Sequence, residues 1–414
     1  MNVLLITLAD IWSLDEHGVY PDLMREFGSH GHFVAIVSPT ASNRLSDICI
    51  CEGKDILIVK LPSGSIQKTN SITKAFNTIA LDSRLKRVIV SRLAHIKFDL
   101  VLYSTPPVTI TQTISYVKKR DNAQTYLLLK DIFPQNAVDL GMLRTGGFMG
   151  LMHKFFEAKE RELYRVSDYI GCMSPANVKY LLANNPFIPP ERVEVCPNSI
   201  EQKSWELSDE ERAYWRAKYD LPQDKPIFVY GGNIGKPQGV DFIIECLKAN
   251  EAQPRALFMI VGSGTEFNKL QRYFSSETPR QARLLSLLSQ QEYDYVCAAC
   301  DVGLIFLDHR FTIPNFPSRL LAYMDASMPI LAATDCSTDL GIIIEEGKFG
   351  LWCESTNVDV FMQQVQQLCN PTLRKQMGQA ARHYLEQNYT SQHSYNVIMN
   401  HFIGGKSCST TKPC

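Results

Sequence analysis

The residues whose spacing most directly suggests chemistry lie in the range 227–239. A short apolar run ends at Gly231 and Gly232, passes through a loop that contains Gly235 and a single cation, Lys236, and enters an apolar face at helical spacing. Glycines can bring backbone N–H groups close to a phosphate, and a helix N-terminus favours negative charge. Tight turns between strand and helix also use glycine for steric reasons. The stretch therefore predicts either an anion site or an ordinary turn.

A second element of the same kind follows near Pro317. Proline and a hydroxyl, Ser318, stand at a predicted helix start, and the guanidinium of Arg319 follows. Ser318 with neighbouring backbone N–H groups could hold a phosphate, and Arg319 could pair with it. The alternative is a capped structural helix with a surface arginine. Two such elements together favour a paired site for an anion.

Candidate acid–base residues stand in the first half of the chain. Lys130 and Asp131 follow the strand-like run 125–129, at the end where open α/β sheets place ligands. Asp131 could act as a general base beside Lys130, or the two could form a buried structural ion pair. His17, before Gly18, is a further catalytic candidate in the first predicted loop.

The elements that must position these residues alternate as in a parallel sheet. No Gly-x-Gly-x-x-Gly follows the first strand, which disfavours a dehydrogenase. The alternation starts afresh after Ile200, so we predict an α/β fold of two doubly wound Rossmann-like domains facing a cleft. The expected divisions are domains at 1–200 and 201–385, a closing helix at 386–403 that packs back on the first domain, and a disordered tail at 404–414. The expected strands are 2–7, 33–37, 56–60, 100–103, 125–129, 169–173, 227–230, 256–261, 283–287, 302–307, 330–333 and 350–353.

The composition of the chain narrows its class. With 414 residues, 45% hydrophobic and 21% charged, it has the size of two ordinary globular domains. A net charge of −1 gives no electrostatic argument for nucleic acid as a partner. The first residues resemble a buried strand rather than a signal peptide, and no segment reaches transmembrane length, so we expect a cytoplasmic protein. Cys297 and Cys300 have metal-ligand spacing but no second pair, so we expect core packing there.

Two stretches combine apolar and basic residues in a way that suits a membrane surface. The helical stretch Phe148–Arg165 carries large apolar side chains beside lysines and arginines, and Ser83–Arg92 is an amphipathic basic helix. Packing in the core and an ordinary solvated face are the alternatives. We expect peripheral association with the inner face of the cell membrane.

In the order and spacing of its motifs, nearly the whole chain resembles the family 4 retaining glycosyltransferases of the GT-B fold. The kin it suggests are bacterial capsule and O-antigen sugar transferases. The matching runs are Val229–Gly239, Val261–Gly264, Ala299–Val302, Phe316–Met324 and Pro329–Ala332 in the second half, and Lys130–Pro134 and Arg165–Ile170 through Ser174 in the first.

The resemblance implies transfer of a sugar, with retention, from a nucleotide-diphosphate sugar to a polyprenyl-linked saccharide. It assigns the acceptor to the first domain and the donor to the second, with no cofactor. No Asp-x-Asp element suited to a metal stands at a strand end, so protein cations are expected to neutralise the diphosphate. The catalytic candidates are Asp131, Lys130 and His17; the donor-binding candidates are Gly232, Asn233, Gly235, Lys236, Gly262, Ser318 and Arg319.

This sequence departs from the family pattern in two places. The family's glutamate pair falls on Pro314 and Ala322, and the cation pair of its first glycine loop falls on Asn233 and Gln238. Ribose recognition must then differ, and Lys236 is the cation left in the loop. A nucleotide-sugar epimerase of the same architecture, or an inactive paralogue that binds nucleotide sugar, are the competing interpretations. The sequence does not name the sugar, the nucleotide, the acceptor or the linkage.

Overall fold

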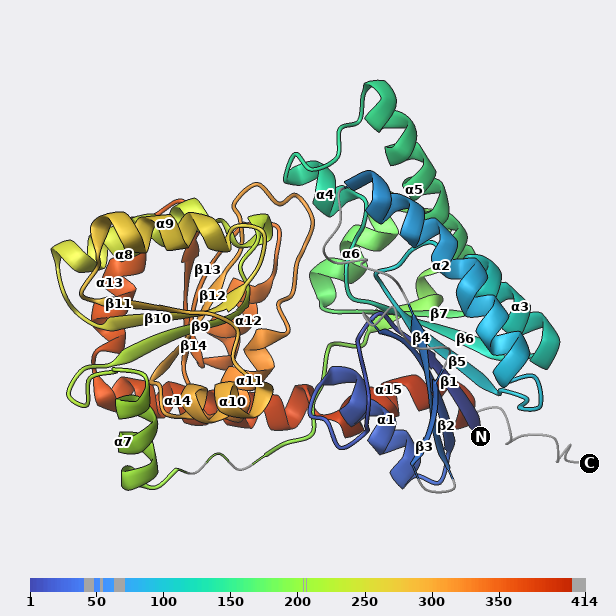
Figure 1. Cartoon of the computed structure of the whole chain (residues 1–414), viewed down its shortest axis with the longest axis horizontal. Helices are drawn as coiled ribbons and strands as arrows, with labels where there is room; N and C mark the ends of the chain where they lie inside the picture. The colour runs from blue at the N-terminus through green and yellow to red at the C-terminus, as the bar shows by residue number, and fades with distance from the viewer. Residues whose placement is uncertain (41–47, 53–54, 63–70, 204, 206, 404–414) are drawn as a thin grey trace, which may run out of the picture. The chain divides into compact units, whose positions relative to one another are not determined.

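The computed structural model describes residues 1–40, 48–52, 55–62, 71–203, 205 and 207–403 (Figure 1). By its internal contacts the chain divides into two compact units, Met1–Glu201 with Thr390–Cys414, and Gln202–Tyr389. We call them unit 1 and unit 2. The expected tail, 404–414, lies outside the described residues, as does the side chain of Phe148.

Unit 1 is built on an eight-stranded sheet in the order β3-β4-β2-β1-β5-β6-β7-β8. All neighbours pair in parallel except β3 with β4, which are antiparallel. The sequence analysis predicted neither β3 nor β8. The strands are β1 Asn2–Ile6, β2 Phe33–Thr40, β3 Ile48–Glu52, β4 Ile56–Pro62, β5 Leu100–Ser104, β6 Gln124–Leu129, β7 Tyr169–Cys172 and β8 Val193–Val195.

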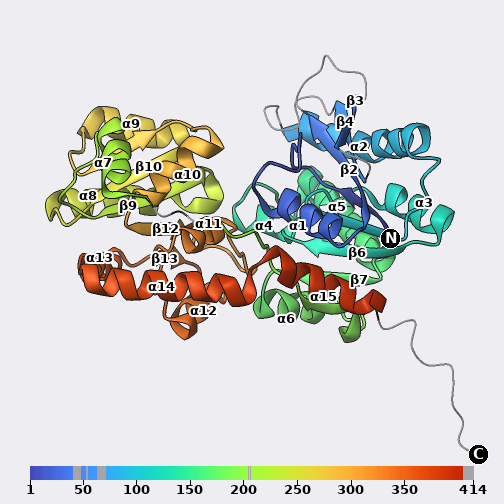
Figure 2. The same ribbon diagram turned by 90° about the horizontal axis from the view of Figure 1, so that it is seen from below.

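Helices cover both faces of this sheet, which is why its central strands are apolar throughout. Leu4 and Ile6 of β1 pack into one core cluster, and Val3 and Leu5 pack into the other, as the alternation of a strand requires. The first cluster lies beneath α2, α3, α5 and α6, and the second beneath α1 and α15 (Figure 2). The helices are α1 Val19–Ser29, α2 Ser71–Arg92, α3 Thr111–Asp121, α4 Gln135–Asp139, α5 Gly147–Val166, α6 Pro175–Asn184, η1 Pro190–Arg192 and α15 Ser391–Ile403.

Unit 2 holds a six-stranded sheet, parallel throughout, in the order β11-β10-β9-β12-β13-β14. Its strands are β9 Ile227–Asn233, β10 Leu257–Ser263, β11 Ala282–Leu285, β12 Val302–Phe306, β13 Ile330–Thr334 and β14 Gly350–Glu354. The strand expected at 283–287 is therefore shorter and begins one residue earlier. Its helices are α7 Asp209–Lys218, η2 Lys236–Gln238, α8 Val240–Ala252, α9 Phe267–Glu277, α10 Gln290–Ala298, α11 Arg319–Asp325, α12 Leu340–Gly347, α13 Val358–Leu368 and α14 Pro371–Asn388.

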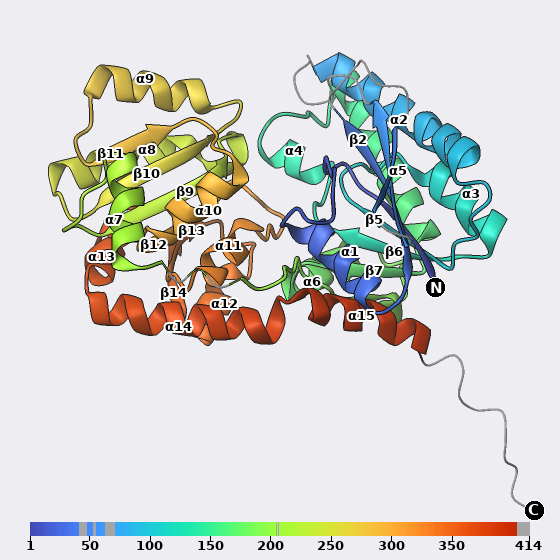
Figure 3. The ribbon, with the colours of Figure 1, turned by 60° about the horizontal axis from the view of Figure 1, so that its bottom comes forward.

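Local sequence signals fix several helix ends. Ser208 and Glu211 form a capping box at the start of α7, and Pro175 follows the N-cap Ser174 of α6. In unit 2, α14 packs along α11 and α12 (Figure 3). It ends at Asn388, and α15 begins three residues later in unit 1, where Ser391 donates its backbone N–H to the carbonyl oxygen of Ile200 at 3.1 Å.

The predicted fold class of two parallel-sheet α/β domains is confirmed. Cys297 and Cys300 are buried free thiols at the end of α10, so they pack in the core. Much of the apolar character of α5 is core as well, because Phe156, Leu163 and Tyr164 are buried in the unit 1 cluster. In the described ranges, no helix is both long enough and apolar enough to span a bilayer.

Candidate functional site

Two glycine turns lie side by side at the carboxyl-terminal edge of the unit 2 sheet. β9 and β10 pair there through Gly232 and Gly262. A Cβ atom on Gly262 would lie 1.9 Å from the carbonyl oxygen of Gly232, and Gly232 has a φ of 123°. Only glycine permits this approach and this backbone angle. Gly232 is exposed, so bare backbone is accessible at the edge where open α/β sheets bind ligands, whereas Gly262 is buried and allows β10 to lie close to β9.

The side chain of Arg319 lies against this bare backbone. Its guanidinium carbon is 4.1 Å from the ring centre of Tyr230, and a Cβ on Gly232 would lie 3.6 Å from its Nη2. Nη1 is buried without a hydrogen-bond partner, and no carboxylate pairs with Arg319 in the part of the chain that the structure describes. A permanently charged, partly buried group without a counter-ion is costly, and it suits a site that an anion completes.

Two further tyrosines form the wall behind this site. Gly231 donates its backbone N–H to the hydroxyl oxygen of Tyr323 at 3.2 Å. A Cβ on Gly231 would lie 1.9 Å from the hydroxyl of Tyr293, so the tyrosine packs directly on the glycine. Burial raises the pKa of both phenols, which keeps them neutral beside the guanidinium. Tyr323 lies in the run Phe316–Met324 that matches the family, but neither tyrosine was predicted as a site residue, because only the packing of α10 and α11 brings them to the end of β9.

The loop after β9 is held by its own side chains. Gln238 is buried, and its Oε1 accepts hydrogen bonds from the backbone N–H of Gly235 at 2.9 Å and from Nδ2 of Asn233 at 3.2 Å. The two positions at which the family carries cations therefore shape the loop here. Lys236 is exposed at the start of the 3-10 turn η2. Asn233 and Gly235 are thus brought together with Gly232, whereas Lys236 extends into solvent.

Ser318 stands immediately before α11. It is exposed, and its hydroxyl forms no capping hydrogen bond, so the predicted cap is absent. The helix runs only from Arg319 to Asp325. Pro314 is buried in the preceding loop and Ala322 is partly buried within α11, so neither family glutamate position carries a polar side chain.

In unit 1, Lys130 and Asp131 follow the end of β6, as predicted. The hydroxyl oxygen of Thr105 accepts hydrogen bonds from both backbone N–H groups, at 3.0 and 3.1 Å, and donates to the carbonyl oxygen of Asp131 at 3.0 Å. Nζ of Lys130 donates to the carbonyl oxygen of Cys196 at 3.3 Å, and burial lowers its pKa to about 8. The backbone at this strand end is therefore fixed by a single threonine.

The carboxylate of Asp131 forms neither an ion pair with Lys130 nor a hydrogen bond to any other described residue. The alternative of a buried Lys130–Asp131 pair is therefore wrong. Burial raises the pKa of Asp131 to about 6. Burial raises the pKa of the Tyr20 phenol, from α1. The negative charge of Asp131 lies close enough to raise the pKa of this phenol further. A carboxyl group that titrates near neutrality is suited to proton transfer.

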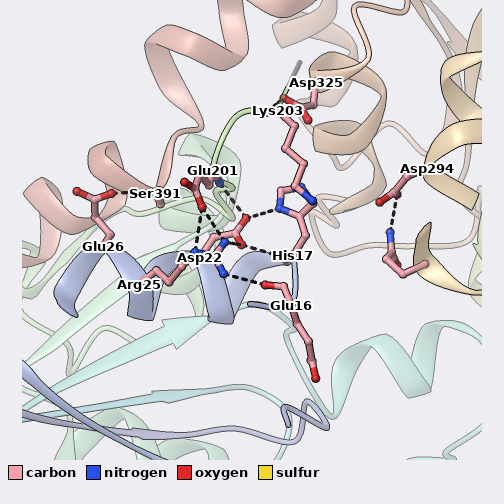
Figure 4. A network of polar contacts seen from close by, with 12 residues as sticks. Glu16, His17, Asp22, Arg25, Glu26, Glu201, Lys203, Asp294, Asp325 and Ser391 are labelled. Carbon is pink, nitrogen blue, oxygen red and sulfur yellow. Dashed lines mark hydrogen bonds and ion pairs between the residues drawn. The ribbon is translucent and has the colours of Figure 1, made fainter. Parts of the chain in front are cut away.

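His17 belongs to a different polar network (Figure 4). Its Nδ1 lies 3.0 Å from Oδ2 of Asp22, an ion-pair contact. Asp22 is buried at the start of α1, and burial opposes its ionisation. The contact with His17 and backbone N–H groups outweigh burial, so the pKa of Asp22 is lowered. No hydrogen bond or ion pair joins His17 to Asp131 among the described residues, so the two catalytic candidates act separately.

The described side chains include no group of three or more His, Cys, Asp or Glu residues that could hold a metal ion. Each unit thus carries its own candidate groups, glycine backbone and Arg319 in unit 2, and Asp131 and His17 in unit 1.

Sequence comparisons match this division. Residues 211–384, which lie in unit 2, match the family model described as "Glycosyl transferases group 1". The probable glycosyltransferase WbjE of Pseudomonas aeruginosa is 23% identical over 295 residues, which cover 70% of this chain and 71% of WbjE. The putative colanic acid biosynthesis glycosyl transferase WcaI of Escherichia coli K12 is 23% identical over 313 residues, 74% of each chain.

Solved structures share the fold at low sequence identity. WaaG, described as a glycosyltransferase involved in lipopolysaccharide biosynthesis, superposes with a TM-score of 0.67 at 15% identity and covers 96% of this chain and 99% of its own. Anabaena HepE in complex with UDP and glucose gives a TM-score of 0.69 at 12% identity, covering 97% and 99%. The fold is that of the GT-B glycosyltransferases.

Proposed function

We propose that this glycosyltransferase, whose residues 211–384 match the group 1 family, moves a hexosyl or hexosaminyl group from a nucleotide-diphosphate sugar to a lipid-linked saccharide. The pathway we propose is the assembly of a bacterial surface polysaccharide such as capsule, O-antigen or exopolysaccharide. The observation that carries the proposal is Arg319, a cation without a counter-ion, beside bare glycine backbone at a sheet edge.

The donor diphosphate suits this site chemically. A guanidinium presents its N–H groups in a planar fork that matches phosphate oxygens, and stacking on Tyr230 fixes the plane of the fork. The exposed backbone of Gly232 lies beside the guanidinium with no side chain of its own to shield it from a phosphate, and the missing Cβ of Gly262 leaves room for the Gly232 carbonyl. Lys236, exposed in the neighbouring loop, adds a second positive charge at longer reach. The UDP complex of HepE supports a uridine donor as the first to test.

The same groups would assist departure of the leaving group. Negative charge develops on the diphosphate as the glycosidic bond breaks, and a fixed cation in a partly desolvated place stabilises that charge. Because we assign this role to Arg319 and Lys236, transfer should persist in excess chelator. Loss of transfer in EDTA, restored by magnesium or manganese, would contradict the assignment.

On the acceptor side, we propose Asp131 as the group that assists removal of the hydroxyl proton. Its carboxylate is unpaired, and its pKa of about 6 lies close to neutrality. Lys130, tied to Cys196, would orient the acceptor, and His17 is the second catalytic candidate. Retention follows from the family resemblance, in which the donor phosphate itself helps to take the proton.

The names of WcaI, for colanic acid biosynthesis, and of WaaG, for lipopolysaccharide biosynthesis, support a polysaccharide pathway. A lipid-linked acceptor would require contact with a membrane surface. The first turn of α5 and the loop before it carry Leu151, 66% exposed, and Met142, 51% exposed, with exposed Arg144 and Lys154 nearby in sequence. Apolar side chains beside cations suit the headgroup region of an anionic bilayer.

Liposome flotation tests the membrane part of the proposal. Replacing both Leu151 and Met142 by serine should release the protein from anionic vesicles. The matched control is Leu287→Ser, because Leu287 is also 66% exposed but lies in unit 2. Peripheral binding through this surface would be contradicted if wild type, the double variant and Leu287→Ser floated equally, or if wild type did not float with the vesicles at all.

The absence of both glutamates, at Pro314 and Ala322, favours one other candidate, an inactive paralogue that binds nucleotide sugar. Incubation of UDP-glucose, UDP-N-acetylglucosamine and GDP-mannose with the protein, with and without a polyprenyl-lipid extract, separates the possibilities. Lipid-dependent release of the nucleotide supports transfer. Binding without turnover supports the paralogue, and an isomerised sugar without acceptor supports an epimerase.

A further inference from the structure

A single buried carboxylate, Asp22, organises the loop that carries His17 (Figure 4). Its side chain is fully buried, and each of its oxygens has two partners. Oδ1 accepts the backbone N–H of Gly18 at 3.1 Å and lies 2.5 Å from Nη2 of Arg25. Oδ2 accepts the backbone N–H of Glu201 at 2.8 Å and lies 3.0 Å from Nδ1 of His17.

We propose that Asp22 is a positioning residue that selects the orientation and the tautomer of His17, so that Nε2 of His17 is presented as a proton acceptor in the sugar transfer. This inference rests on the proposed function for the role of His17. The selection of the tautomer is a property of the network alone and can be measured without any substrate.

The tautomer follows from the donors that surround Asp22. Nδ1 of His17 is buried and lies 3.0 Å from Oδ2 of Asp22, although off the direction of a regular hydrogen bond. Since both oxygens of Asp22 are acceptors, the neutral imidazole is stabilised when Nδ1 carries the hydrogen. Nε2 is then left as an acceptor, and it forms no hydrogen bond with any described residue. The His17 side chain is 13% exposed, so the imidazole is largely enclosed yet reachable.

The loop around His17 is held from a second side by Arg25. Its Nη1 donates to the carbonyl oxygens of Leu14 and Glu16, the latter at 2.9 Å. Its Nη2 also lies 2.7 Å from Oε2 of Glu201. The charged groups of unit 1 in this network are therefore Asp22, Arg25 and Glu201, with Glu16 in the same loop. Arg25 offsets the charge of Asp22 and locks the backbone on both sides of His17.

The network also includes the connection between the units. Glu201 is the last residue of unit 1 before Gln202, and its backbone N–H uses the same oxygen of Asp22 that faces His17. Two residues further on, within unit 2, the backbone N–H of Lys203 donates to Oδ1 of Asp325 at 3.1 Å. Asp325 is likewise buried, and it is paired with Arg382 at 2.7 Å. Asp325 is therefore a matched control for Asp22.

The experiment measures ¹⁵N chemical shifts of the His17 imidazole at a pH where it is neutral, in full-length wild type, Asp22→Asn and Asp325→Asn. We expect the Nδ1–H form in wild type and in Asp325→Asn. In Asp22→Asn the amide nitrogen faces Nδ1, which must then accept, so the Nε2–H form is expected. Should Asp22→Asn fail to fold, the wild-type tautomer alone decides: an Nε2–H imidazole in wild type overturns the proposal.

A double-mutant cycle then tests whether Asp22 acts through His17 in sugar transfer. Asp22→Asn should lower the turnover number by roughly tenfold to a hundredfold with a small change in donor KM, as misorientation of a reacting group does. In a His17→Gln background, Asp22→Asn should have less than about a threefold further effect, because the two residues act as one unit. Full additivity, or a His17→Gln variant with wild-type turnover, would overturn the proposal. If wild type transfers no sugar, the proposed function fails, while the tautomer result stands on its own.

Discussion

Arg319 in unit 2 and Asp131 in unit 1 are alike in one respect and opposite in another. Each is an ionisable side chain at the carboxyl-terminal edge of a parallel sheet, and neither has a counter-ion among the described residues. Arg319 stays charged under all conditions and is fixed on an aromatic ring. Asp131 changes charge near pH 6. A fixed cation suits binding of an anion, whereas a carboxyl group that titrates suits proton transfer.

Other buried charges of the chain show that the fold satisfies such groups where it can. Lys60 is fully buried, yet its Nζ contacts Asp10 and donates to the carbonyl oxygen of Ile11 at 2.8 Å and to the hydroxyl of Ser38 at 3.0 Å. Arg216 is 5% exposed and pairs with Asp301 at 2.7 Å. Arg319 and Asp131 differ from these groups because neither has a counter-ion among the described residues, which makes both candidates for functional groups.

The largest effect should come from Arg319→Gln. Loss of the cation that stabilises the departing diphosphate should lower kcat/KM for sugar transfer by about 10²–10³. Removal of an unpaired charge should not destabilise the protein. Steady-state kinetics and thermal unfolding measure the two effects.

Arg216→Gln sharpens the contrast, because this arginine is paired. It removes the pair with Asp301 and the hydrogen bonds to the carbonyl oxygens of Ala299 and Pro222. Arg212 still pairs with Asp301, so we expect the free energy of unfolding to fall by about 1–3 kcal/mol. If Arg319→Gln destabilised the protein as strongly, Arg319 would be a structural arginine.

Asp131→Asn should reduce turnover by about 10² while donor affinity changes little, because donor contacts are assigned to unit 2. Turnover and the Kd for UDP are measured on the same preparation. A variant that loses nucleotide binding, or keeps full turnover, would move the proton-accepting role to His17.

The stability of Asp131→Asn should depend on pH in a definite direction. The pKa of Asp131 is raised in the folded chain, so its contribution to stability is fully present below about pH 4 and is lost as pH rises through about 6. Asn has no such loss. The variant should therefore gain about 1–2 kcal/mol over wild type by pH 8, less than the full shift implies because the side chain is partly exposed. Urea unfolding at pH 4, 6 and 8 tests this; a constant difference would contradict it.

Lys236→Ala should have the smallest effect. The side chain is exposed on a short turn, so its attraction to a phosphate is screened by water and salt. We expect the donor KM to rise about fivefold at low salt and the difference to shrink above 0.5 M salt. If Lys236→Ala lowered kcat/KM as strongly as Arg319→Gln, Lys236 would have to contact the donor phosphate directly.

Sequence patterns predicted all of the parallel strands except the three-residue β8, because apolar runs of strand length, bounded by glycine and proline, leave few alternatives. They located Gly232, Gly262 and Arg319 for the same reason, since those residues sit at strand and helix ends. The antiparallel β3 contains only four apolar residues, Ile48–Cys51, and this short run was not recognised as a strand. The roles of Tyr293 and Tyr323 could not be predicted from the sequence, because only tertiary packing brings α10 and α11 to the end of β9.

The lack of an ion pair between Lys130 and Asp131 was also beyond sequence reasoning. Neighbouring residues at a strand end can turn either way, and the direction depends on Thr105 and Cys196, which are distant in the chain. Asp22 was not singled out either. Three of its partners, His17, Gly18 and Arg25, are close in sequence, but its burial and its contact with Glu201 arise only in the folded chain.

Equilibrium binding of UDP and GDP by calorimetry tests the central claim, that Arg319 holds the donor diphosphate, without requiring an acceptor. The control is Arg283→Gln, which removes the same charge from a surface pair with Asp220 in the same unit. We predict that Arg319→Gln weakens the Kd of the bound nucleotide by about 10–100-fold, the value of a charged hydrogen-bonded contact, and that Arg283→Gln changes it by less than about twofold. Equal Kd values for wild type and Arg319→Gln would contradict the claim.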